Sequence, residues 1–318
     1  MSANPTKIVF MGTPEFAIPS LLTLLDGDDS VVLVVTQPDQ PSGRGKRLEA
    51  PPVKIAALKR NIPVIQPNKI SEADCLHMLV GLAPDLLIVV AFGQILPKSV
   101  LDIPPLGCVN VHPSILPKYR GAAPINWAII RGEKATGVTT MLLDEGMDSG
   151  DTLLIREVAI GGEETAGDLH DRLAVIGADL LAETIRGLKE KKITPIPQKH
   201  SMKTFAPRLK KEDGIIDWSK SAQEIKNHVR GMTPWPGAFS ALDNENIKIF
   251  HVSALFGKTD GVIPGTVLDT VGHGIVVSTG DGLILISELQ LPGKRRMSAS
   301  EFLRGRRIEK GALFKGRG

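Results

Sequence analysis

Cysteine is nearly absent from this chain of 318 residues, which has only Cys75 and Cys108. The two form no Cys-x-x-Cys pair, and the histidines show no metal-ligand spacing such as His-Glu-x-x-His, so we expect reduced thiols and no metal site. No apolar run approaches the roughly 20 residues that cross a bilayer. The first strand pattern begins at Ile8, so we expect no signal peptide. These absences favour a cytoplasmic protein without a membrane contact.

Two common catalytic loops are also missing. Gly12-Thr13-Pro14 follows the first strand pattern, but the Gly-x-Gly-x-x-Gly spacing of dinucleotide-binding enzymes is not present. A tight turn with proline at the start of a helix explains these residues better than a hydride-transfer site. A serine hydrolase is disfavoured because the chain has no Gly-x-Ser-x-Gly elbow.

Charge is unevenly distributed along the chain, although the net charge is only +3. Nine of the 38 basic residues lie in 186–211 against one acid, and nine lie in 291–318 against two acids. The rest of the chain has 20 basic and 32 acidic residues. A solvated linker and a solvated tail would explain such runs without a binding function. Two separate basic runs on an acidic background slightly favour a polyanionic partner, RNA, over that explanation.

The first half of the chain alternates short β-branched runs with helix-like stretches, which is typical of a doubly wound, mostly parallel, Rossmann-like α/β sheet. The predicted strands are Lys7–Met11, Val31–Val35, Pro63–Ile65, Leu86–Ala91, Cys108–Val111 and Gly137–Leu142. The predicted helices are Pro14–Leu25, Pro51–Asn61, Glu72–Leu82, Ala123–Arg131 and Thr165–Leu188. In such sheets ligands bind beyond the carboxyl ends of the strands.

The second half has a different pattern, and the length of the chain exceeds the 250 to 300 residues or so at which a single core stops growing. After a basic, proline-bearing connector and a helix at Ala222–Arg230, five short strands are predicted at Ala238–Leu242, Ile247–Val252, Gly265–Asp269, Gly274–Thr279 and Leu283–Glu288. Five strands fit a small oligonucleotide-binding-like β-barrel. We therefore expect a catalytic domain at 1–189, a linker at 190–210 and a barrel domain at 211–318.

Asn110 and His112 end one of the predicted strands, and Pro113 stops further strand pairing. Side chains two residues apart in a strand point to the same side, so this amide and this imidazole would face one space. Asp148 follows in a loop rich in glycine and carboxylates. Such a set suits acyl transfer without a nucleophile: Asn110 would stabilise an oxyanion, while His112 and Asp148 would handle protons.

The long segment from Thr36 to Arg47 reads as a loop between a strand and a helix. Loops of this length are often functional, although a disordered surface insertion is comparably consistent with the sequence. Arg44, Lys46 and Arg47 would place three cations at its tip, where they could contact a phosphate backbone.

Several of these segments together resemble the folate-dependent formyltransferases. The resemblance covers the whole chain and rests on Asn110-x-His112-Pro113-Ser114-Ile115-Leu116-Pro117, Arg120-Gly121-Ala122-Ala123-Pro124-Ile125, Asp148-Ser149-Gly150-Asp151, Trp235-Pro236-Gly237 and Gly280-Asp281-Gly282. With the loop around Arg44 and the second domain, the chain is most similar to the members that act on methionyl-tRNA.

The resemblance implies transfer of a formyl group from 10-formyltetrahydrofolate to the α-amine of initiator methionyl-tRNA, by a monomeric enzyme without a metal. It assigns Asn110, His112 and Asp148 to catalysis, and Ser114, Ile115, Leu116 and Pro117 to folate binding. Ile115 stands where leucine is usual, an exchange that conserves volume and apolarity. Arg44, Lys46 and Arg47 would contact tRNA, as would the basic connector and the barrel.

Two other functions fit parts of the sequence. A formyltransferase for a glycinamide nucleotide or an amino sugar would use the same first domain, but it would not be expected to carry both the basic connector and the barrel. A non-catalytic RNA-binding protein would not need Asn110, His112 and Asp148 together.

Overall fold

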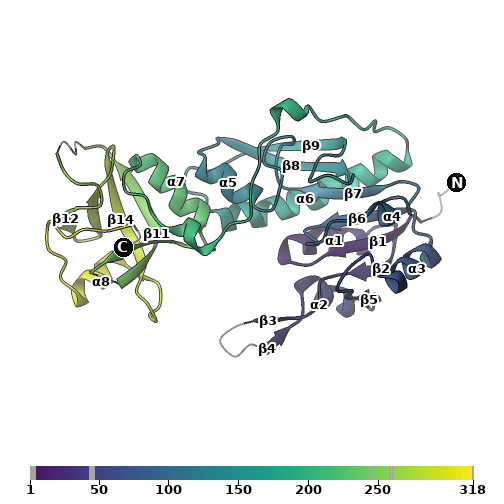
Figure 1. Cartoon of the computed structure of the whole chain (residues 1–318), viewed down its shortest axis with the longest axis horizontal. Helices are drawn as coiled ribbons and strands as arrows, with labels where there is room; N and C mark the ends of the chain where they lie inside the picture. The colour runs from purple at the N-terminus through teal and green to yellow at the C-terminus, as the bar shows by residue number, and fades with distance from the viewer. Residues whose placement is uncertain (1–4, 43–46, 244, 258, 260, 317–318) are drawn as a thin grey trace. The chain divides into compact units, whose positions relative to one another are not determined.

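The computed structural model describes residues 5–42, 47–243, 245–257, 259 and 261–316 (Figure 1). Arg44 and Lys46 of the predicted tRNA-binding loop lie outside these residues, and of Arg47 only the backbone is described. Contacts divide the chain into two compact units. Unit 1 comprises Met1–Gly121, Ala135–Ala159 and His170–Phe205, and unit 2 comprises Ala122–Lys134, Ile160–Leu169 and Ala206–Gly318. The domain limits at 189 and 211 stay a prediction.

Unit 1 is built on a seven-stranded sheet with the order β5-β2-β1-β6-β7-β8-β9. The strands are β1 (Lys7–Gly12), β2 (Ser30–Val35), β5 (Val64–Ile65), β6 (Leu86–Val90), β7 (Cys108–His112), β8 (Ala135–Leu142) and β9 (Thr152–Ala159). The first five strands in this order pair in parallel, which confirms the mostly parallel α/β fold. Strand β8 is antiparallel to both of its neighbours, β7 and β9. Strand β9 was not predicted from the sequence; Arg156 and Glu157 interrupt its apolar pattern.

Helices cover both faces of this sheet. The helical segments are η1 (Glu15–Ala17), α1 (Ile18–Leu25), α2 (Pro52–Lys59), α3 (Ala73–Leu82), α4 (Lys98–Leu101), α6 (Ala166–Lys189) and η2 (His200–Met202), and the first four residues of α6 belong to unit 2. Cys108 of β7 joins one apolar cluster with Leu79 of α3 and Val100 of α4. On the other face, a Cβ at Gly177 of α6 would lie 2.9 Å from Cγ1 of Val111. The side chains of β7 therefore alternate between two covered faces.

The segment predicted as a long loop contains a short hairpin instead. Strands β3 (Gln40–Ser42) and β4 (Arg47–Glu49) pair antiparallel, and Asp39 anchors the base through Lys54 at 2.8 Å and Gln66 at 2.7 Å. The hydrogen bond from Lys54 holds the pKa of the Asp39 carboxyl below its ordinary value. The prediction missed these strands because Pro41 and the glycines suggested irregular backbone.

Unit 2 has the five predicted strands and a short sixth. They are β10 (Ala238–Leu242), β11 (Glu245–Leu255), β12 (Val267–Val271), β13 (Gly274–Ser278), β14 (Leu283–Gln290) and β15 (Met297–Ser298), with the antiparallel order β10-β11-β14-β13-β12 and β15 beside β14. The helical segments are α5 (Pro124–Ile130), η3 (Lys211–Gly214), α7 (Ala222–Met232) and α8 (Ala299–Gly305). Gly231 brings α7 against α5, since a Cβ there would lie 2.4 Å from Cγ1 of Ile130.

Residues 311–315, which we call the strap, join the two edges of this sheet. Near β12, Val267 N–H donates to the carbonyl of Ala312 and Phe314 N–H donates to that of Gly265, both at 2.8 Å. On the β10 side, Lys315 and Ala241 exchange hydrogen bonds of 2.8 and 3.0 Å. The edge strands β10 and β12 are thus linked through the strap, which makes the sheet barrel-like.

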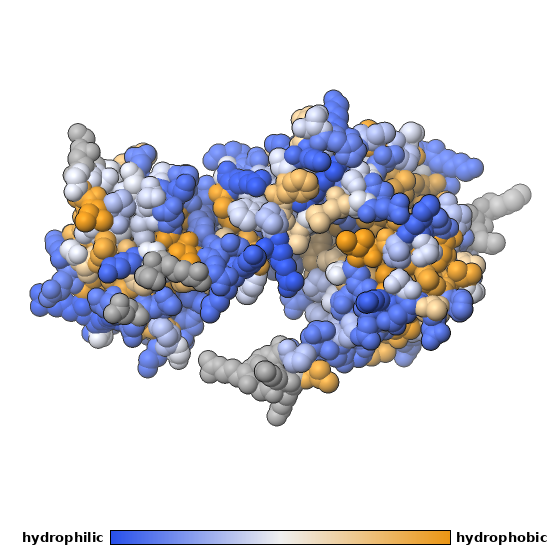
Figure 2. Space-filling view, in the orientation of Figure 1, coloured by the Kyte–Doolittle hydropathy of each residue, from blue (hydrophilic) through white to orange (hydrophobic). Residues whose placement is uncertain are grey.

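Most of the face shown in Figure 2 is hydrophilic, with apolar side chains exposed in small patches. No helix in the described part of the chain is long and apolar enough to span a membrane.

Candidate active site

Asn110 and His112 lie on the same face of β7 as Cys108, as the strand pattern predicts. His112 is buried, with 4% of its surface exposed, whereas Asn110 is half-buried. The side chain of Asn110 makes no hydrogen bond to any residue that the structure describes. Its amide is therefore available to an oxygen atom of a bound substrate.

The imidazole of His112 is held from two sides within unit 1. Nε2 lies 3.0 Å from the carbonyl oxygen of Tyr119, which only accepts, so Nε2 bears a proton and donates it. Nδ1 faces Oδ2 of Asp148 at 3.7 Å. A proton that reaches Nδ1 would lie between the ring and the carboxylate of Asp148.

Asp148 reaches His112 by a route that the sequence did not indicate. Strand β8 runs antiparallel to β7, so the chain leaves it beside Cys108, where Leu143 N–H donates to the Cys108 carbonyl at 2.8 Å. The loop then turns back, and Asp148 adopts a left-handed φ of 48°. Its Oδ2 accepts a 2.7 Å hydrogen bond from Gly121 N–H. The convergence is as predicted, although the direction of β8 differs.

Gly150 allows this loop to close tightly. A Cβ at Gly150 would lie 1.9 Å from the carbonyl oxygen of Leu142, so no other residue fits without moving the backbone. At the other end of the loop, Asp144 accepts hydrogen bonds from Gly146 N–H at 3.0 Å and Ser149 Oγ at 2.8 Å. The path of the loop, and with it the position of Asp148, follows from these contacts.

Gln198 secures the same loop from the connector, and sequence reasoning missed it. Its Nε2 donates to the carbonyls of Asp148 and Gly150, at 2.9 and 2.7 Å. Its Oε1 accepts from Nε and Nη2 of buried Arg120, at 3.2 and 2.6 Å, and the same Nη2 lies 3.3 Å from Nδ1 of His200. The sequence feature that could have indicated Gln198 is an uncharged polar residue within a basic segment.

Two of the four residues in the predicted folate-binding segment are buried in contacts within the protein. Ser114 is fully buried and donates from Oγ to the Lys118 carbonyl at 2.7 Å, and Leu116 is 4% exposed. Ile115 and Pro117 are half-buried. Ile115 and Pro117 therefore leave part of their apolar surface exposed, whereas Ser114 and Leu116 are buried beneath.

The site offers neither a metal cluster nor a reactive thiol. Among the described residues, no group of three or more His, Cys, Asp or Glu side chains could hold a metal ion. Desolvation by burial, with a smaller contribution from Asp102, raises the pKa of Cys108 to about 12. This thiol is therefore protonated at neutral pH and is no nucleophile. The available chemistry is hydrogen bonding by Asn110 and proton handling by His112 and Asp148.

Comparison with known proteins identifies the family. Residues 6–185 match the family described as formyl transferase, and residues 208–307 match the formyl transferase C-terminal domain. The chain belongs to the formyltransferase family. The matched regions include the predicted site residues Asn110, His112 and Asp148 in the first region and all strands of the barrel-like sheet in the second.

Similar formyltransferases extend over nearly the whole chain. A methionyl-tRNA formyltransferase of Citrifermentans bemidjiense is 52% identical over 308 residues, covering 97% of this chain and 96% of the relative. One of Geobacter sulfurreducens is 50% identical over 305 residues, covering 96% and 95%.

Solved structures share the fold at lower identity. The sugar 3N-formyl transferase WlaRD superposes with a TM-score of 0.67 at 19% identity, over 92% of this chain and 100% of that one. HypX from Aquifex aeolicus, in complex with tetrahydrofolic acid, gives 0.60 at 18% identity, over 99% of this chain and 51% of that one.

Proposed function

We propose that this formyltransferase transfers the formyl group of 10-formyltetrahydrofolate to the α-amine of initiator methionyl-tRNA. The observation that carries the proposal is the identity of about half with enzymes named methionyl-tRNA formyltransferase over both family regions. The arrangement of Asn110, His112 and Asp148 supports it, because it supplies what formyl transfer needs without a covalent enzyme intermediate.

In the proposed reaction, the amine nitrogen attacks the formyl carbon, and the carbonyl electrons move to the oxygen. The amide of Asn110 donates a hydrogen bond to this oxyanion, a contact that contributes on the order of 3 kcal/mol in comparable sites. The oxyanion then collapses, the bond from carbon to N10 breaks, and N10 takes up a proton. The net change is one N–H lost by the amine and one gained by the folate.

His112 and Asp148 would conduct the proton in this scheme. Because Nε2 is engaged by the Tyr119 carbonyl, Nδ1 is the ring nitrogen left for the reacting groups and for Asp148. The carboxylate stabilises the positive charge that the ring acquires between accepting a proton from the amine and delivering it to N10. Proton transfer of this kind contributes about 10²- to 10⁴-fold to a rate.

We assign the folate contacts to the surface formed by Ile115 and Pro117, above the buried Ser114 and Leu116. For tRNA we propose the cations of the connector, among them the exposed Lys199, Lys203 and Arg208, together with Arg44, Lys46 and Arg47. In the sequence, exposed cations lie on both sides of the uncharged, buried Gln198, which gives the connector two uses. Its polar interior side supports the loop of Asp148, and its outward side supplies charge for a phosphate backbone.

A panel of acceptors tests this function. The purified protein and 10-formyltetrahydrofolate are incubated with initiator methionyl-tRNA, elongator methionyl-tRNA, glycinamide ribonucleotide or an amino-sugar nucleotide, and formyl incorporation is measured. We expect transfer to initiator methionyl-tRNA, with a KM for the tRNA that rises with salt as phosphate contacts release counterions. Preferred transfer to either small acceptor would refute the proposal. A monomeric state and a cytoplasmic location stay predictions, and size-exclusion chromatography tests the first.

A further inference from the structure

The outer face of the sheet in unit 2 carries a hollow around Phe239 that the proposed reaction does not use. Along β10 the odd-numbered side chains, Phe239 among them, point outward, and Phe239 pairs across to Lys248 of β11, which pairs to Gln290 of β14. Two adjoining hollows of about 260 and 390 Å³ share Phe239, Asn246 and Lys211. These two volumes are near the range of small-ligand sites.

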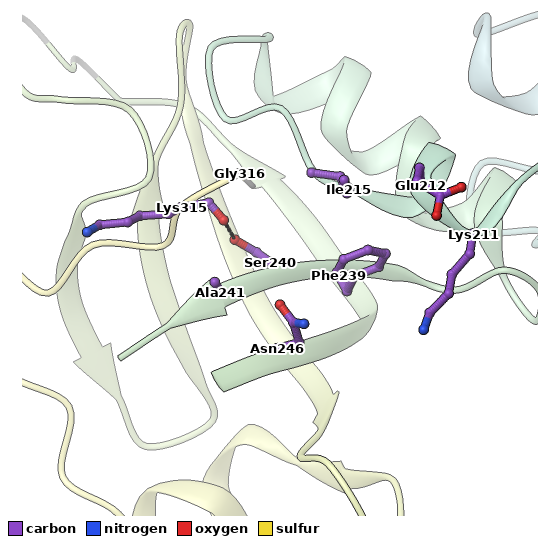
Figure 3. A pocket seen from close by; sticks show the side chains of 9 residues that line it. All are labelled: Lys211, Glu212, Ile215, Phe239, Ser240, Ala241, Asn246, Lys315 and Gly316. Atoms are coloured by element: carbon purple, nitrogen blue, oxygen red, sulfur yellow. Dashed lines mark hydrogen bonds between the residues drawn. The ribbon is translucent and has the colours of Figure 1, made fainter. Parts of the chain in front are cut away.

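Figure 3 shows the Phe239 ring next to the Asn246 side chain, with Lys211 extending on the far side of the ring from Ala241. The ring rests on Gly214, where a Cβ would come within 3.2 Å of its Cε1. Glycine at this position therefore supports the ring from beneath and leaves it half-buried rather than covered.

Three of the polar side chains around the ring have no partner among the described residues. Lys211 and Lys248 are exposed and form no ion pair with a described residue, and the Asn246 amide makes no hydrogen bond to one. Among the residues that the structure describes, Glu212 is the one acid that lines either hollow. A half-exposed aromatic ring with two lysines and an amide lining the same hollows matches the way in which single-stranded nucleic acid is bound: a base stacks on the ring, and cations hold the backbone.

We propose that this face binds a short unpaired segment of RNA, with one base stacked on Phe239, its edge within reach of Asn246, and the flanking phosphates at Lys211 and Lys248. The inference rests on the proposed function for its choice of RNA as the partner. An acidic peptide would use the lysines but would gain little from the ring and the amide, so the observations favour RNA.

Phe250 on β11 provides a matched control, because its ring is already covered. The guanidinium of Arg296 lies 4.5 Å from its centroid and is itself paired with Glu288. Lys310 is the matched control for the charge of Lys248, because its ammonium is already paired with Asp269 at 3.0 Å.

The test uses the full chain and a six-nucleotide single-stranded RNA with 2-aminopurine at a central position, whose fluorescence falls when the base stacks. We expect Phe239→Leu to weaken binding about 5- to 50-fold, as loss of one stacked base does, and Phe239→Tyr to bind within about twofold of wild type. Phe250→Leu should leave binding unchanged. Lys248→Gln should lower the salt slope of log Kd by roughly 0.7, and Lys310→Gln should not.

The inference is overturned if Phe239→Leu binds as wild type does, if both phenylalanine variants weaken binding equally, or if polyglutamate competes as well as RNA does. Its failure is separable from that of the proposed function. Formylation of methionyl-tRNA by wild-type protein together with RNA binding that ignores Phe239 refutes the stacking face alone. Phe239-dependent RNA binding without formylation of any tRNA refutes the proposed reaction alone.

Discussion

Replacing Gln198 with leucine removes the side chain that ties the Asp148 loop to the connector while keeping its volume. The carbonyls of Asp148 and Gly150 lose their donors, and Arg120 keeps only the 3.3 Å contact with His200 among the bonds described for its guanidinium. A buried polar group left without a partner costs about 1 to 3 kcal/mol. For two carbonyls, with some relaxation of the loop, we expect a loss of about 2 to 4 kcal/mol in the free energy of unfolding.

The same change should reduce turnover by more than a general loosening would. Asp148 occupies a left-handed conformation that costs about 1 to 2 kcal/mol for most residues, and Gln198 holds the carbonyl of Asp148 itself and that of Gly150, two residues later. Once released, the loop can relax and carry the carboxylate away from His112. A displacement of about 1 Å in a catalytic site can lower kcat by about 10²-fold. We therefore expect a kcat about 100-fold lower, with a KM for folate within about twofold of wild type.

The assay is formyl transfer with both substrates saturating, alongside urea unfolding of the same samples. Asn126→Leu is the control, because Asn126 also donates from a side-chain amide to a backbone carbonyl, that of Gly231 at 2.8 Å, but within unit 2. The Asn126→Leu protein should be about 1 kcal/mol less stable and should keep the wild-type kcat. A Gln198→Leu protein that is destabilised as calculated yet retains kcat within twofold would show that Gln198 only supports the fold.

Three further outcomes are expected. His112→Ala and Asp148→Asn should each lower kcat about 10²- to 10⁴-fold while the Kd for folate changes little, and unchanged kcat in steady-state assays would remove them from catalysis. Cys108, with its pKa raised to about 12 by burial, should resist a thiol reagent at pH 8 until urea unfolds the protein; rapid labelling of the native state would contradict its burial. Burial also lowers the pKa of His228 in the folded protein below its ordinary 6.5, so the unfolded chain takes up the proton first and stability falls as the pH drops below 6.5. Urea unfolding at pH 7.5 and 5.5 should show this loss in wild type and a smaller one in His228→Phe.

The parts of the site that the sequence predicted are those set by local geometry. Asn110 and His112 share a face because the period of a strand is two, and this needs no knowledge of the rest of the chain. Apolar runs rich in β-branched residues marked the parallel strands for a similar reason, since both their faces are covered.

The parts that were missed depend on partners far away in sequence. Gln198 lies 50 residues after Asp148 and 78 after Arg120, so nothing near it indicates its hydrogen bonds. The antiparallel direction of β8 depends on the length and path of the segment that precedes it rather than on its own apolar pattern. The hairpin at Pro41 forms although a proline and nearby glycines argue locally against strands.

The strap also has a consequence for how the protein is made on the ribosome. Lys315 is translated 74 residues after Ala241, its partner on β10. At about 5 to 20 residues per second, the β10 edge waits roughly 4 to 15 seconds for that partner. During this interval its backbone can pair with the strand of another nascent chain. Codons that slow translation between these two residues should therefore increase aggregation of newly made protein, whereas equally slow codons before Ala238 should not.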